Sequence, residues 1–190
     1  MNLILVIITA ALVNNVVLSQ FYGLCPFLGV SKQLKTAAGM GAAVIFVVTV
    51  SSALCALLYN FVLVPFSLEY LRTIVFIVVI AALVQLVEMV LKKMSRGLYV
   101  ALGVYLPLIT TNCCVLGAVL TNVQNEYDFI TSVCSGFGAS LGFAISIILM
   151  AGVREKIAHN TVTKSFQGMP VVLLSACLMA IAFYGFRGLV

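Results

Sequence analysis

Six apolar stretches alternate with short polar connections along the chain. Each is close to the roughly 20 residues that a helix needs to cross the hydrocarbon core of a bilayer. They cover residues 3–22 (continuing through 30), 37–58, 73–91, 98–120, 129–153 and 169–188. The pattern predicts an all-α membrane protein with six transmembrane helices, folded as a single transmembrane domain over residues 1–190.

The basic residues predict how these helices are oriented. The connections after the first, third and fifth stretches hold eight of them: Lys32, Lys35, Lys92, Lys93, Arg96, Arg154, Lys156 and Lys164. The opposite side holds only Arg72 and Arg187. Because basic loops stay in the cytoplasm, we expect both termini and the acidic connection 122–128 to lie outside.

Composition supports a lipid environment. Apolar residues make up 64% of the chain and charged residues 8%, and a soluble domain of this size has too much surface to bury so many apolar side chains. The net charge of +5 does not indicate nucleic-acid binding, because the basic residues are spread over short loops. Met1-Asn2 supplies no basic region for a signal peptide, so we expect a retained first helix.

A short motif recurs in the two halves of the chain. Cys25-Pro26-Phe27-Leu28-Gly29 and Cys113-Cys114-Val115-Leu116-Gly117 both fit C-x-x-L-G, and a spaced glycine pair follows each. Each half has three predicted helices, and an odd number of spans ends on the opposite side of the membrane. A duplicated second half must therefore be inverted relative to the first. We therefore expect inverted repeats over about residues 1–93 and 97–190, with chance similarity between apolar segments as the alternative.

Helices one and four are expected to be broken at these cysteine motifs. Pro26 follows Cys25, while Pro107 and the polar run ending in Asn112 precede Cys113. Proline removes a backbone donor, and freed backbone groups at membrane depth are tolerated only inside protein or along a cavity. Inverted repeats place a shared site at such interruptions. A buried polar site is the preferred interpretation, and ordinary proline kinks are the alternative.

Cysteines in such a site favour a soft metal centre. Thiolate ligands suit zinc, Cu(I) or iron–sulfur clusters, and the N-terminus of a half-helix favours an anionic group. Gly29 and Gly117 would let the backbone approach a cluster closely. Because a [2Fe–2S] centre normally takes four thiolates, the simplest arrangement uses two from this chain and two from a related partner. A disulfide between Cys25 and Cys113 is the alternative.

The other polar residues in the apolar stretches indicate structural roles. Glu88 lies four residues before Lys92, which favours an ion pair. Asn14 and Asn15 are expected to hydrogen-bond between helices, with an ion path as the alternative. Nucleotide-binding motifs and catalytic triads are absent from the sequence, so we expect no catalytic residue and no soluble cofactor.

Three segments carry a resemblance to a known family. Gly23–Lys32, Leu106–Cys113 and Arg154-Glu155-Lys156 resemble the signature of the A subunits of Rnf complexes, and the similarity covers essentially the whole chain. The E subunits of the sodium-pumping NADH:quinone reductase are the nearest related group. They tend to lack the proline at position 26, so the resemblance favours the Rnf assignment.

The resemblance implies a role in electron transfer. Rnf complexes lie in the bacterial or archaeal cytoplasmic membrane and pass electrons between ferredoxin and NAD while moving sodium ions or protons. Their A and E subunits are homologous, oppositely oriented six-helix proteins that share one [2Fe–2S] cluster. By motif match, Cys25 and Cys113 are this chain's two ligands, with Gly29, Asn112 and Gly117 around the cluster.

The implied activity therefore belongs to the complex and not to this chain alone. Its expected partners are the E-type subunit, other Rnf subunits that carry flavin and iron–sulfur centres, and the lipid bilayer. Whether Cys114 ligates stays open, although the repeat register supports Cys113. An E-type subunit of the quinone reductase, a small inverted-repeat transporter and a purely structural scaffold are the alternative functions.

Overall fold

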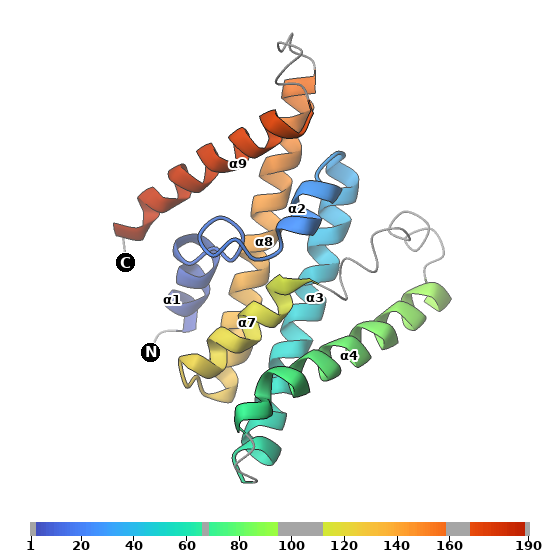
Figure 1. Cartoon of the computed structure of the whole chain (residues 1–190), viewed down its shortest axis with the longest axis vertical. Helices are drawn as coiled ribbons and strands as arrows, with labels where there is room; N and C mark the ends of the chain where they lie inside the picture. The colour runs from blue at the N-terminus through green and yellow to red at the C-terminus, as the bar shows by residue number, and fades with distance from the viewer. Residues whose placement is uncertain (1–2, 66–68, 95–111, 159–167, 189–190) are drawn as a thin grey trace.

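The computed structural model describes residues 3–65, 69–94, 112–158 and 168–188, and every regular element in these ranges is helical (Figure 1). The elements are α1 (Leu3–Ile8), η1 (Thr9–Val13), α2 (Leu24–Val30), α3 (Leu34–Leu58), η2 (Tyr59–Leu63), η3 (Glu69–Leu71), α4 (Arg72–Met94), α7 (Cys113–Gln124), α8 (Phe129–Ala158), α9 (Met169–Tyr184) and η5 (Gly185–Gly188). The predicted all-α class is confirmed.

Several helices are apolar enough for a membrane. Three in the described ranges are also long enough to cross it: Leu34–Leu63, Arg72–Met89 and Phe129–Ala158. Three shorter apolar helices are Leu3–Val13, Cys113–Gln124 and Met169–Tyr184. Large apolar side chains cover the outside, and Ile4, Phe61 and Ile181 are 70 to 74% exposed. An exterior of this kind matches lipid or other membrane subunits as its surroundings.

Helices α3 and α8 form the centre of the fold and run antiparallel. Gly41 near the start of α3 faces Ala144 in the second half of α8, and a Cβ on Gly41 would lie 3.1 Å from that of Ala144. At the other end, Gly136 faces Ser52. Small residues at both crossings let the two backbones approach closely, as is usual between membrane helices. Helix α4 packs on α3 and α9 on α8, on opposite flanks in Figure 1.

The first apolar stretch is not one continuous helix, which corrects the prediction for residues 14–22. The helix ends at Val13, and α2 starts only at Leu24. Between them, the side-chain oxygen of Asn15 accepts hydrogen bonds from the backbone N–H groups of Val17 and Leu18, at 3.0 and 3.2 Å. An asparagine side chain that satisfies nearby backbone donors in this way competes with helix formation.

The break therefore lies upstream of Cys25 and is not made by Pro26. Pro26 lies in the first turn of α2, where the missing backbone donor has no helical acceptor in any case. The two pieces of the first stretch run along α8 in the same direction. Gly142 of α8 lies against Ala11, and Arg154 near its end contacts Leu28.

The fourth apolar stretch is described only from Asn112 onward. Helix α7 begins at Cys113, as the predicted break requires, and continues to Gln124. Pro107 and the first part of the predicted helix lie outside the described residues. The fifth helix is longer than predicted, since α8 continues through Ala158. Arg154 and Lys156 are therefore helical residues and not part of a loop.

A candidate cofactor site between two broken helices

The starts of the two broken helices meet in the structure. The backbone N–H of Gly23, the residue before α2, donates a hydrogen bond to Sγ of Cys113, the first residue of α7, at 2.9 Å. Gly23 has a φ of +79°, and a Cβ there would lie 3.1 Å from the Cβ of Cys114 and 3.2 Å from Oδ1 of Asn112. Only glycine combines this conformation with so close an approach. Nothing in the sequence indicated this contact.

The exposure of the thiols distinguishes the two adjacent cysteines. Cys25, the second residue of α2, and Cys113 are both exposed, whereas Cys114 is fully buried. Cys113 therefore faces outward from the chain and Cys114 lies in the core. All six cysteines are free, so the alternative of a disulfide between Cys25 and Cys113 has no support in the structure.

Asn112 fixes the start of α7. Its extended backbone and its side-chain oxygen, which accepts the N–H of Cys114 at 3.0 Å, make it the N-cap of the helix. The side chain is 4% exposed, and its Nδ2 has no hydrogen-bond partner among the described residues. Asn112 thus positions Cys113 and leaves a buried donor beside the two cysteine motifs.

The two motif glycines have different surroundings. A Cβ on Gly117 would lie 2.5 Å from the ring of Tyr22, so this glycine provides room for the tyrosine. Gly29 has no atom within 4 Å of the position that its Cβ would take, apart from its own helix. Space beside Gly29 is open, as the prediction of close approach requires, whereas the space beside Gly117 is already filled.

An arginine holds the far end of α2. Arg154 of α8 donates from Nη1 to the backbone oxygen of Leu28 at 2.8 Å and to Oγ of Ser31 at 2.9 Å. The last carbonyls of a helix lack partners within it, and a cation stabilises that end. Helix α2 is therefore anchored to α8. In the sequence, Arg154 was counted only as a basic residue that indicates orientation, which gave no indication of this contact.

Asn15 ties the broken segment to α8. Its Nδ2 donates to the backbone oxygens of Ala11 and Gly142, both at 3.0 Å, and its Oδ1 accepts from Oγ of Ser146 at 3.2 Å. The predicted hydrogen bond between helices is confirmed for Asn15, while Asn14 is exposed. The predicted pairing of Glu88 with Lys92 cannot be followed, because the Lys92 side chain lies outside the described residues.

The described part of the chain brings no three His, Cys, Asp or Glu side chains together as metal ligands. A centre with four thiolates would therefore need ligands beyond these residues. The two exposed cysteines lie at the starts of two helices, and Cys113 is held by the backbone donor of Gly23 directly after the buried Asn112.

Known proteins resemble this chain over its full length. The family model described as "Rnf-Nqr subunit, membrane protein" matches residues 3–190. The A subunit of the Na(+)-translocating ferredoxin:NAD(+) oxidoreductase complex of Acetobacterium woodii is 58% identical over 100% of this chain and 98% of its own. The A subunits of the ion-translocating oxidoreductase complexes of Syntrophotalea carbinolica and Actinobacillus pleuropneumoniae are 52% and 53% identical, over 98 to 100% of this chain and 97 to 98% of their own. The chain belongs to the Rnf-Nqr subunit family of membrane proteins.

Proposed function

We propose that this chain is the A-type subunit of an ion-translocating ferredoxin:NAD oxidoreductase complex of the cytoplasmic membrane. In this complex it relays electrons through a [2Fe–2S] cluster shared with a homologous subunit. Full-length relatives that are named as such subunits support membership of the complex. The observation that carries the relay is the contact of Gly23 with the sulfur of Cys113, which brings the two cysteine motifs together.

The residues present fit half of a four-thiolate centre. Cys25 and Cys113 are free and exposed, and thiolates are the ligands that iron–sulfur clusters take. The N–H of Gly23 stabilises negative charge on the Cys113 sulfur, and donors to cluster sulfurs are among the factors that set a reduction potential. When bound, such a cluster would take up and release single electrons. The chain itself orients the Cys113 thiol through Gly23, and the buried Phe143 and Cys114 pack against that glycine.

The partner in this proposal supplies the other two thiolates. It is a homologous membrane protein of opposite orientation, and both cysteines of this chain face outward where such a partner could complete the cluster. The remaining subunits would carry the flavin and iron–sulfur centres that deliver and receive electrons on either side of the membrane.

The proposal includes six spans arranged as inverted repeats. Each half has a short helix that opens at a cysteine motif, α2 or α7, followed by a long central helix, α3 or α8. The central helices are antiparallel, as inversion of the second copy requires. Lys32 and Arg154 lie at one end of this pair, and Leu5 and Tyr127 line one cavity at the other. Both groupings agree with basic loops in the cytoplasm and with the N-terminus outside.

Low-temperature EPR with iron quantitation tests the relay. The sample is the purified complex, prepared anaerobically, with Cys25→Ser, Cys113→Ser, Cys114→Ser and Cys177→Ser variants. Cys177 is a matched control because it is also exposed and free but lies on α9. We expect Cys25→Ser and Cys113→Ser each to remove one [2Fe–2S] signal and the corresponding two iron atoms, while Cys177→Ser changes neither.

The outcome for Cys114→Ser identifies the ligand. Loss of the signal in Cys114→Ser with retention in Cys113→Ser would move the ligand by one residue and contradict the role of the exposed thiol. A wild-type complex with intact thiols and no iron assignable to these cysteines would reject the relay. Ion uptake by vesicles that contain this chain alone would then favour the small transporter.

A further inference from the structure

Helix α4 has one face that the described residues leave uncovered. The helix packs on α3 and α7, and its buried residues Phe76, Ile80 and Val84 belong to the core. The other side, the open face of α4, carries large apolar side chains that are 49 to 67% exposed: Ile74, Ile77, Val78, Leu86 and Met89. Between Ile74 and Met89 this face is about 22 Å long, and α4 lies at the edge of the molecule (Figure 1). A straight apolar face of this length fits a second membrane helix.

Gln85 interrupts this apolar face. Within the described residues 74–89 it is the one polar residue whose side chain is exposed. Its amide has no hydrogen-bond partner in the part of the chain that the structure describes. The nearer charged end of the span is Lys92, seven residues on, or about 10 Å along the helix, which is farther than a glutamine side chain extends. The amide therefore lies within the membrane span and not at its aqueous end.

Lipid tails cannot satisfy the Gln85 amide. A glutamine side chain has two N–H donors and an accepting oxygen, and a polar group in hydrocarbon without a hydrogen bond is costly. Between membrane helices, such side chains form hydrogen bonds across the contact. The occupant that the open face favours is therefore a protein helix with a polar side chain at the depth of Gln85, and not lipid alone.

Small residues beside Gln85 leave room for this helix. Ala81 and Ala82 lie four and three residues before Gln85, on the same side of α4, and Ala82 is exposed. Alanine at a crossing lets two helix backbones approach closely. Val78 and Leu86, one turn to either side of Ala82, provide apolar contact above and below the crossing. The approach brings Gln85 within reach of a side chain on the second helix.

We propose that the open face of α4 binds a transmembrane helix of another subunit of the complex, and that Gln85 forms a hydrogen bond with an amide or hydroxyl side chain of that helix. Relatives of this chain are named as subunits of oxidoreductase complexes, so other subunits are its expected neighbours. The inference rests on the proposed function only for membership of a complex. It does not depend on the cluster, because α4 carries neither cysteine motif.

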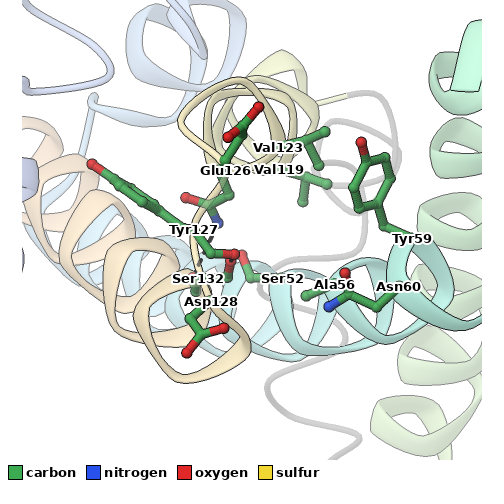
Figure 2. A pocket seen from close by; sticks show the side chains of 11 residues that line it. Ser52, Ala56, Tyr59, Asn60, Val119, Val123, Glu126, Tyr127, Asp128 and Ser132 are labelled. Atoms are coloured by element: carbon green, nitrogen blue, oxygen red, sulfur yellow. Dashed lines mark hydrogen bonds between the residues drawn. The ribbon is translucent and has the colours of Figure 1, made fainter. Parts of the chain in front are cut away.

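Asn60 provides a matched control for Gln85. It is also an exposed amide, but it lines a cavity of about 260 Å³ at the end of α3, together with polar residues such as Ser52 and Ser132 (Figure 2). A polar cavity of this size has room for water. The Asn60 amide therefore has polar surroundings without a second membrane helix.

Photo-crosslinking in the purified complex tests which molecule covers α4. Val78 and Met89, on either side of Gln85, are replaced one at a time by p-benzoylphenylalanine, and crosslinked peptides are identified by mass spectrometry. We expect both positions to crosslink to one transmembrane helix of a different subunit, with an Asn, Gln, Ser or Thr between the two crosslinked sites. Crosslinks to lipid alone, or to a second copy of this chain, would contradict the proposal.

Dissociation in detergent tests the role of Gln85. The purified complex is diluted into micelles, and the detergent-to-protein ratio at which half of the crosslinked subunit has dissociated is recorded. We expect Gln85→Leu to lower this ratio about threefold to eighteenfold, the effect of losing one hydrogen bond between membrane helices. Gln85→Asn keeps the amide and should lower the ratio less, while Asn60→Leu should match the wild type.

A wild-type dissociation ratio for Gln85→Leu would overturn the proposal. So would an equal decrease in Gln85→Leu and Asn60→Leu, because the effect would then not belong to the open face. EPR on the same samples separates this result from the relay. A normal cluster signal with an unchanged dissociation ratio rejects only the α4 interface, and a missing cluster with the predicted dissociation pattern rejects only the relay.

Discussion

Replacing Asn15 with alanine should destabilise the whole fold, because this side chain makes the connections that hold the broken first helix. It is 0% exposed and lies between η1, the irregular segment and α8. Its amide donates to Ala11 and Gly142, and its oxygen accepts from Val17, Leu18 and Ser146. Alanine removes all five hydrogen bonds at once.

The magnitude follows from the groups that lose a partner. The N–H groups of Val17 and Leu18 belong to residues that are 0% and 5% exposed, and a buried donor left unsatisfied costs roughly 1–3 kcal/mol. The hydrogen bond to Gly142 on α8 adds about 0.6–1.7 kcal/mol, as such bonds do between membrane helices. We therefore expect Asn15→Ala to lower the free energy of unfolding by about 3–8 kcal/mol.

Reversible unfolding in mixed detergent micelles, followed by circular dichroism, measures this loss. Asn14→Ala is the matched control, since Asn14 is the adjacent residue with the same side chain and is exposed; it should change stability by less than about 0.5 kcal/mol. Ser146→Ala removes one of the five partners and should cost about 1 kcal/mol. Equal stability of the Asn15→Ala and Asn14→Ala proteins would refute the structural role of Asn15.

Three further substitutions test contacts in the same region. Arg154→Ala should cost about 1.5–3 kcal/mol by the same unfolding assay, because charged hydrogen bonds at the end of α2 are lost; a neutral result would contradict the anchor. Gly142→Ala should cost about 1–3 kcal/mol, since its Cβ would lie 2.5 Å from the backbone oxygen of Ala11, whereas Gly152→Ala meets nothing within 4 Å and should be neutral or stabilising. Gly117→Ala should displace the Tyr22 ring and raise Tyr22 fluorescence quenching by acrylamide in a variant without other tyrosines; unchanged quenching would contradict the contact.

The pattern of hydrophobic residues predicted the long helices well, because the thickness of the hydrocarbon core sets the length of each span. A span must cover the hydrocarbon core, so the apolar stretches 37–58, 73–91 and 129–153 correspond to α3, α4 and α8. The errors lie at the ends. Helix α8 continues past Arg154, whose charge looked like a loop signal but is paired with the end of α2.

The break in the first helix was predicted for the wrong reason. Proline is the strongest helix breaker in the sequence, yet Pro26 lies in the first turn of α2, where it is tolerated. The interruption comes from Asn15, and its hydrogen bonds depend on Gly142 and Ser146, which are more than 120 residues away along the chain. A local pattern contains no information about such partners.

The contacts of Ser52 and Asn122 were missed for a similar reason. Neither residue belongs to a motif in the sequence. Only the packing of α8 against α3 and α7 places Gly136 against Ser52 and the backbone oxygen of Ser132 within hydrogen-bond distance of Asn122.

The choice between Cys113 and Cys114 shows where sequence and tertiary structure each contribute. Asn112 is a good N-cap, so the sequence is enough to start α7 at Cys113, and consecutive residues on a helix then point about 100° apart. The thiols of Cys113 and Cys114 must therefore have different surroundings, but helix geometry alone does not show which of them is exposed. The approach of Gly23 decides it, because this glycine packs against the Cβ of Cys114 and donates its N–H to the sulfur of Cys113. The exposed thiol in the second half of the chain, which is the proposed ligand, is thus selected by the break in the first half, so neither cysteine motif can be interpreted without the other.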